Sequence, residues 1–216
     1  SDGTQFTQAT LSKRPMATTV NGWPAMQFDG VDDGLELGSD VVGTGDVTIV
    51  AVVRPTGLGG GNLGRILEWG SGGNQFLAIN TNGTVIYYNQ SGTSVSDTGS
   101  VPLNGKSVVV LCRKASGAST IYSNGVRVTA EDVAGGLPLV GAATNIGNRP
   151  AGDRAFQGLI SYISIHKRIL SVPEIQALTR YLSQNRAPET WSFSVSAGTI
   201  NTTITDAGTA TWQLPD

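Results

Sequence analysis

Three carboxylates fall within five residues at Asp29, Asp32 and Asp33, and Gly30 and Gly34 lie beside them. Carboxylate oxygens are the hard ligands that Ca²⁺ prefers, so a metal site built on Asp29 and Asp33 is one interpretation. The other is a tight turn between two strands, because Asp and Gly are both turn-forming residues. We expect the turn and no resident cofactor, with calcium at Asp29 and Asp33 as the open alternative.

The spacing of the acidic residues does not favour catalysis. A retaining glycosidase needs two carboxyl groups about 5 Å apart, whereas the adjacent Asp32 and Asp33 would point to opposite faces of a strand. Glu68 stands alone beside Trp69, and His166 is the sole histidine. The sequence also lacks a P-loop, a dinucleotide-binding fingerprint and a metal-binding histidine pair. We therefore expect that the protein is not an enzyme.

Aromatic and amide side chains point to a different chemistry. A sugar ring stacks on an aromatic face, while planar amides and charged groups bind its hydroxyls. Each candidate also has a structural interpretation, in which Trp69 and one tyrosine of Tyr87-Tyr88 belong to the core and segment 70–73 is only a glycine-rich loop. The candidate segments are residues 65–75, 87–90 and 149–154. Within them the candidate glycan ligands are Trp69, Asn74, Gln75, Tyr88, Asn89, Arg149 and Asp153.

The composition indicates a β protein with one main domain. The 216 residues include 29 glycines, and only 14% are charged. The net charge of −2 comes without a Lys/Arg cluster, so we expect neither nucleic acid nor a membrane surface as a partner. The longest apolar run, residues 47–53, is too short to cross a bilayer. Cys112 is the only cysteine and lies in an apolar run, which predicts a buried, unreactive thiol.

Short apolar runs between turn signals predict an antiparallel sandwich or barrel. Residues 47–54 have apolar side chains at both parities, which predicts a central strand covered on both faces. Asn-Gly dipeptides at 82–83 and 124–125 predict two hairpins. A change of parity between Ile160 and Ile163 predicts a bulge. The expected strands are residues 25–29, 35–37, 47–54, 65–69, 75–80, 85–88, 107–113, 120–123, 126–129 and 159–167.

A helix and a second segment follow these strands. Ser171 and Glu174 form a capping-box pattern, and the apolar spacing after them predicts a helix that ends near Gln184. A linker-like Arg-Ala-Pro stretch then separates the main domain, residues 1–186, from residues 187–216. The second segment is β-like but too short to bury a core of its own. We expect the start of a second β module or a tail that docks on a partner.

Several motifs, in their order and spacing, resemble those of laminin G-like, concanavalin A-like domains of bacterial and phage surface proteins. They are Phe28-Asp29-Gly30-Val31-Asp32-Asp33, Val53-Arg54-Pro55, Val101-Pro102-Leu103-Asn104, Tyr122-Ser123-Asn124-Gly125-Val126, Asn145-Ile146-Gly147 and the run from Phe156 to Ile175. The resemblance covers residues 5–184. It implies an all-β, two-sheet antiparallel β-sandwich, or jelly roll, with one C-terminal helix packed beside it.

The resemblance also bears on the aspartate turn. It implies that the Phe28 ring lies in the core and that a turn follows. Several family members bind calcium near this turn, and many carry a second, distant carboxylate where this chain has Ser161. Catalytic members of the fold commonly carry a Glu-x-Asp-x-x-Glu run on one strand, which this chain lacks.

These observations predict a non-catalytic surface-display module of a larger assembly, with weak glycan adhesion. A phage capsid or tail decoration and a cell-surface adhesin are examples. The alternative is a dedicated carbohydrate-binding lectin module of a secreted protein, and a glycosidase or polysaccharide lyase is less favoured. We expect surface glycan and the larger assembly as partners, the latter through residues 187–216. The expected location is extracellular or on a virion surface.

Overall fold

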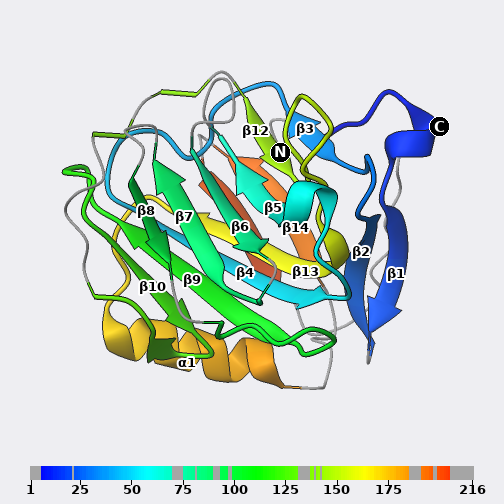
Figure 1. Ribbon diagram of the computed structural model, residues 1–216. Coiled ribbons are helices and arrows are strands. Elements are labelled where there is room, and N and C mark those ends of the chain that lie inside the picture. The colour runs from blue at the N-terminus through cyan, green and yellow to red at the C-terminus, as the bar shows by residue number, and fades with distance from the viewer. Residues whose placement is uncertain are drawn as a thin grey trace.

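The protein folds as a β-sandwich of two antiparallel sheets with an α-helix beside it (Figure 1). The computed structural model describes residues 6–20, 22–69, 75–80, 82–89, 93–96, 99–130, 137–138, 140–141, 143–184, 191–196 and 199–204. Within those residues the two sheets have seven and six strands. The predicted all-β jelly roll with a C-terminal helix is confirmed.

The seven-stranded sheet is centred on β4 (Val47–Pro55), which lies between β13 and β9. Every residue of β4 is buried except Arg54, which is partly buried. This confirms the prediction of a strand covered on both faces. In sheet order the strands are β1 (Met16–Val20), β2 (Trp23–Asp29), β13 (Gln157–His166), β4, β9 (Ser107–Arg113), β10 (Ser119–Ser123) and β11 (Val126–Arg127).

The six-stranded sheet supplies the other side of the core. Leu77 and Tyr87 are paired across two of its strands and are buried in the core. Because side chains alternate along a strand, the next pair, Phe76 and Tyr88, lies on the opposite, outer face. In sheet order the strands are β3 (Leu35–Leu37), β12 (Thr144–Ile146), β5 (Leu63–Glu68), β6 (Phe76–Asn80), β7 (Val85–Asn89) and β8 (Thr93–Ser96). The short 3-10 helices are η1 (Leu11–Lys13) and η2 (Gly60–Asn62).

Large apolar side chains fill the space between the sheets. Phe28 is 1% exposed and meets Phe156 edge to face, with ring centroids 6.3 Å apart. Gly147 must lack a side chain here, since a Cβ at that position would lie 1.9 Å from Phe28 Cε1. Burying a ring of this size stabilises the fold by about 1.5–3 kcal/mol. The core position that the resemblance implied for Phe28 is confirmed.

Helix α1 (Val172–Ser183) packs on the outer side of the seven-stranded sheet. Its Ile175 belongs to a buried cluster that also contains Val50 of β4. The predicted capping box is present, and the Ser171 N–H donates to the Glu174 carboxylate at 2.8 Å. The helix ends one residue before the predicted Gln184. Among the described residues, no helix is long and apolar enough to cross a membrane.

The turn chemistry is also as predicted. Asn124 at φ 50° and Gly125 at φ 79° connect β10 to β11, and Gly83 at φ 70° lies between β6 and β7. The register of β13 against β4 shifts between Ile160 and Tyr162, which confirms the bulge. These features depend on a few neighbouring residues, so the local sequence is sufficient to locate them.

Other elements depart from the sequence prediction or extend it. The sequence did not predict β1, β8 or β12, and every residue of β1 is exposed or partly buried, so no apolar alternation marks it. Near the C-terminal end, β14 (Trp191–Ser196) and β15 (Thr199–Ile204) pair as a separate antiparallel sheet. The strand-like character of this segment is therefore present. Its role as a second module or docking tail stays a prediction.

Candidate functional site

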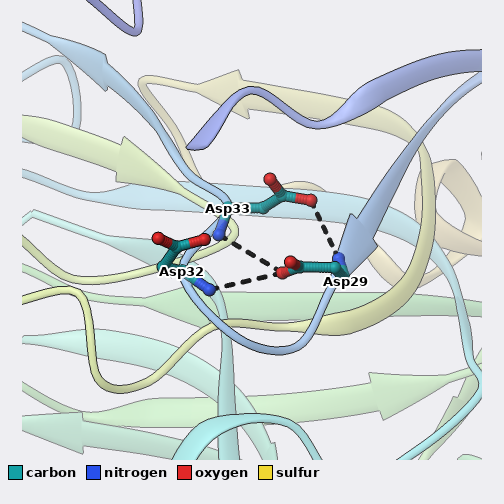
Figure 2. A group of neighbouring side chains, drawn as sticks. All are labelled: Asp29, Asp32 and Asp33. Atoms are coloured by element: carbon teal, nitrogen blue, oxygen red, sulfur yellow. Dashed lines mark hydrogen bonds between the residues drawn. The ribbon is translucent and has the colours of Figure 1, made fainter. Parts of the chain in front are cut away.

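The turn after β2 brings Asp29, Asp32 and Asp33 together (Figure 2). Asp29 Oδ1 accepts the backbone N–H groups of Val31 at 2.8 Å, Asp32 at 3.3 Å and Asp33 at 3.4 Å. Asp33 Oδ2 accepts the N–H of Asp29 at 2.9 Å. Gly30, at φ 82°, completes the reversal. The predicted turn is confirmed, and two of the carboxylates make its internal hydrogen bonds.

The same turn concentrates negative charge, because one oxygen from each Asp lies within 4.8 Å of the others. Burial raises the pKa of Asp33, and the nearby charges of Asp29 and Asp32 raise it further, while the hydrogen bond from the Asp29 amide lowers it. Such oxygens suit a divalent cation. Ser161 lies four residues along β13 from Gln157, the partner of Asp29, so a side chain there is about 13 Å from the turn. Calcium at Asp29 and Asp33 stays a prediction.

Three of the expected glycan ligands lie in the interior instead. Trp69 is 0% exposed and stacks on Tyr87, with ring centroids 6.0 Å apart and planes 8° apart. Gln75 and Asn89 are 0% and 1% exposed. The prediction that Trp69, Gln75 and Asn89 contact a ligand is therefore corrected, because these side chains have no open surface. The alternative core position for Trp69 and one tyrosine is confirmed. Asn74 lies outside the described residues.

The outer face of the six-stranded sheet carries a stack of Arg65, Phe76 and Tyr88, which we call the arginine–aromatic array. The Arg65 Cζ lies 3.2 Å from the centroid of the Phe76 ring. Phe76 stacks on Tyr88, with centroids 5.1 Å apart and planes 11° apart. Tyr88 is partly exposed, whereas Arg65 and Phe76 are buried. Tyr88 is therefore the residue of the array that a ligand can reach.

A buried ion pair supports this array. Arg65 Nε donates to Glu68 Oε2 at 2.9 Å, and the two side chains are 3% and 0% exposed. Residues three apart on a regular strand face opposite ways, but a bulge between Arg65 and Leu67 reverses the alternation. Burial lowers the pKa of Arg65 and raises the pKa of Glu68, and the mutual hydrogen bond opposes both shifts. The pair holds the guanidinium over Phe76 and positions the array.

The loop after β12 lies beside the array. The Arg65 N–H donates to the backbone oxygen of Arg154 at 3.0 Å, which ties the loop to β5. Asn148 Oδ1 accepts the backbone N–H groups of Arg149 at 2.8 Å and Arg154 at 3.1 Å. Arg149 and Asp153 form a two-point ion pair, with Nε–Oδ1 and Nη2–Oδ2 distances of 2.5 Å. The loop is thus ordered by its own side chains.

The charges of this loop remain accessible to solvent. The side chains of Arg149 and Asp153 are 26% and 49% exposed. The hydrogen bonds from Arg149 lower the pKa of Asp153 to about 2. Burial is the main cause that lowers the pKa of the array residue Arg65, and the charge of Arg149 lowers it further. Of the predicted site residues, Tyr88 therefore lies on the outer face of β7, and Arg149 and Asp153 lie on the loop that is tied to β5, two strands away.

Sequence reasoning missed Phe76 as a member of this site. It included Arg65, Glu68 and Arg154 only within the candidate segments 65–75 and 149–154 and did not single them out. One signal was available, because two opposite charges interrupt the otherwise apolar residues 63–68, and charged residues are rarely buried unless they are paired. The partnership of Phe76 with Tyr88 had no such signal. It depends on the register between two strands.

A separate polar pair lies on β13, where Ser164 Oγ and His166 Nε2 are 3.1 Å apart. Ser164 is 1% exposed, so its hydroxyl is closed to a substrate. Burial lowers the pKa of His166, the charge of Arg168 lowers it further, and the charge of Glu174 raises it. This geometry does not favour nucleophilic catalysis. The expectation that the protein is not an enzyme stays a prediction.

A family model described as the concanavalin A-like lectin/glucanases superfamily matches residues 29–176. The chain belongs to this superfamily. The match is to its laminin G-like branch, as the motifs indicated. Comparison with curated protein sequences gives no match.

Solved structures share the fold at low sequence identity. Trypanosoma rangeli sialidase matches with a TM-score of 0.60 and 21% identity, over 79% of this chain and 29% of the sialidase. The SAP-like pentraxin of Limulus polyphemus matches with a TM-score of 0.60 and 14% identity, over 88% and 95% of the two chains. Domain 4 of AbnA, an extracellular arabinanase from Geobacillus stearothermophilus, matches with a TM-score of 0.59 and 16% identity, over 76% and 81%. The chain thus corresponds to under a third of the sialidase.

Proposed function

We propose that the protein is a non-catalytic glycan-binding module whose site is the outer face of the six-stranded sheet. The observation that carries this proposal is the partly exposed Tyr88, whose ring stacks on Phe76, together with the ordered Arg149–Asp153 pair on the loop tied to β5, two strands away. A pyranose ring packs its C–H groups against such an aromatic face. The guanidinium donates to sugar hydroxyls, and the carboxylate accepts from them.

Binding at this site is weak for a single domain. The partly exposed face buries little ligand area, and an exposed hydrogen bond contributes only about 0.5–1.5 kcal/mol. We expect dissociation constants in the high micromolar to millimolar range, which many copies on one particle would convert into useful avidity. This supports a display module of a larger extracellular assembly, such as a cell-surface adhesin or a virion decoration.

Two relatives lend support to a glycan ligand. Domain 4 of the AbnA arabinanase was solved in complex with arabinotriose, and the Trypanosoma rangeli sialidase was solved in complex with sialic acid. Both proteins share only the fold with this chain, at low sequence identity. Their ligands therefore do not identify the ligand of this chain. Our proposal places a glycan on this chain because of its own Tyr88 and loop geometry.

The test is binding to immobilised polysaccharides, with Tyr88→Ala compared against Tyr181→Ala. Tyr181 lies on α1 and contacts Trp23 on the other sheet, so its loss removes an aromatic ring away from the proposed site. Tyr88→Ala should abolish retention, and Tyr181→Ala should retain it. Equal retention by both variants would place any glycan site elsewhere. A broad glycan screen in which no glycan binds above background would refute the proposal.

Catalysis is tested on the same samples. Incubation with the polysaccharides should release neither reducing ends nor unsaturated sugar ends. Release of either product by the wild-type protein would contradict the non-catalytic part of the proposal. Tight and selective binding to one glycan would instead favour a dedicated lectin module.

A further inference from the structure

The proposed glycan site carries a surplus of positive charge. Arg65, Arg149 and Arg154 bring three guanidinium groups to the array and its loop, where Glu68 and Asp153 are their acidic partners. The chain as a whole has a net charge of −2, so this surface has the opposite sign to the molecule. Both carboxylates are already engaged, Glu68 by Arg65 and Asp153 by Arg149.

The surplus charge is on Arg154. Its Nη1 donates to the backbone oxygen of Asp153 at 3.1 Å and lies 3.6 Å from the Asp153 carboxylate, a looser contact than the one Arg149 makes. The Arg154 side chain is 31% exposed. An anionic ligand can therefore approach this guanidinium without displacing a tight ion pair.

Arg154 is also held in place. Its backbone is fixed by the hydrogen bonds with Asn148 and Arg65. Its guanidinium lies against Gly61, where a Cβ would come within 1.9 Å of Nη1. Gly61 has φ 58°, a left-handed conformation that favours glycine. Gly61 therefore leaves room for the guanidinium. These contacts also limit the conformational freedom of Arg154, so a bound ligand has less of it to restrict.

We propose that this site selects acidic glycan chains, with Arg154 beside β5 binding a carboxylate or sulfate group while Tyr88, two strands away on β7, stacks on another sugar ring of the same chain. The inference rests on the proposed function and names its ligand class. A guanidinium matches the planar geometry of a carboxylate and also binds sulfate oxygens through charge-assisted hydrogen bonds. Because the acidic residues at the site are occupied, a neutral glycan gains less from the same surface.

The experiment compares polygalacturonate with its methyl-esterified form, which keeps the backbone and removes the charge. The variant is Arg154→Gln, and the control is Arg127→Gln on β11 of the other sheet, where Arg127 Nε donates to Thr129 O. Arg154→Gln should weaken binding to polygalacturonate by about five- to tenfold. It should leave the weaker binding to the esterified polymer unchanged, and added salt should weaken only the acidic interaction.

Chondroitin sulfate and its desulfated form distinguish the two sources of charge. Loss of affinity on desulfation would assign sulfate as well as carboxylate to Arg154, and unchanged affinity would assign carboxylate alone. Equal affinity for polygalacturonate and its ester, or equal effects of Arg154→Gln and Arg127→Gln, would overturn the acidic selectivity and leave the glycan-binding proposal standing. No binding to acidic or neutral polymers would overturn both.

Discussion

At the scale of single residues, burial separates side chains that the sequence places side by side. Tyr87 and Tyr88 are neighbours, yet Tyr87 stacks on Trp69 in the core and Tyr88 stacks on Phe76 at the surface. Period-two alternation makes one of each such pair internal but does not say which. The sequence therefore predicts that one of the two tyrosines lies in the core and the other at the surface. The structure shows that Tyr87 is the core residue and Tyr88 the surface residue.

Trp69→Ala should destabilise the protein strongly and leave the glycan site intact. A cavity left by a fully buried aromatic ring costs about 3–5 kcal/mol. Denaturant melts measure this loss, and Tyr88→Ala is the comparison, because the Tyr88 ring is partly exposed. If Trp69→Ala abolished glycan binding with an unchanged melt, its position in the core would be wrong.

Asp29 should stabilise the turn through its side-chain oxygen rather than through its charge. Asp29→Asn keeps an oxygen for the N–H groups of Val31, Asp32 and Asp33, whereas Asp29→Ala removes it. We expect Asp29→Ala to cost about 1–2 kcal/mol and Asp29→Asn to cost less. Melts with and without chelator complete the test. A chelator-sensitive melting temperature in the wild type alone would instead indicate a bound cation that both substitutions weaken.

At the scale of elements, features encoded by a few neighbouring residues were predictable. The Asn-Gly hairpins, the β13 bulge and the start of α1 each follow from local turn or cap chemistry. The arginine–aromatic array was not predictable, because it needs the β5 bulge and the registers among β5, β6 and β7. Tyr88, Arg149 and Asp153 could be predicted as site residues from the sequence. The arrangement of the buried residues Arg65, Glu68 and Phe76 could not.

The cap of α1 is a local contribution that one substitution can measure. Both the N–H and the hydroxyl of Ser171 donate to Glu174 Oε2 at 2.8 Å. Ser171→Ala removes the hydroxyl and should lower the free energy of unfolding by about 1 kcal/mol. Ser183→Ala, at the exposed other end of the helix, is the matched control and should change little. Equal midpoints for both variants would show that Ser171 does not act as the cap.

His166 should make stability depend on pH near neutrality. Burial lowers its pKa in the folded protein below the value of 6.5 for a free histidine. The unfolded chain therefore binds a proton as the pH falls through 6.5, whereas the folded chain binds it only at a lower pH, so the free energy of unfolding decreases. Denaturant melts from pH 7.5 to 5.5 should show this decrease in the wild type and a smaller one in His166→Gln. Parallel curves would assign the dependence to other groups.

At the scale of the whole molecule, the two sheets and α1 bury the described core clusters. The core cluster contains residues of both sheets, from Phe28 to Ile165. Helix α1 covers the outer face of the seven-stranded sheet through Ile175 and Leu182. Among the described strands, β14 and β15 form hydrogen-bonded pairs only with each other, although β15 also lies near β13. The proposed glycan site likewise lies within the sandwich and the loop after β12. Folding and binding should therefore be separable from the last segment of the chain.

A chain truncated after Gln184 should keep the melting temperature of the full chain within about 2 °C, because a change of 1 kcal/mol shifts a domain of this size by roughly 2–4 °C. It should also retain glycan binding, since Tyr88, Arg149 and Arg154 remain in place. Calorimetry and the polysaccharide assay measure the two outcomes. A loss of many degrees, or aggregation, would show that residues 191–204 stabilise the sandwich and contradict the predicted boundary at residue 186. Intact folding with lost binding would place part of the glycan site on the removed segment.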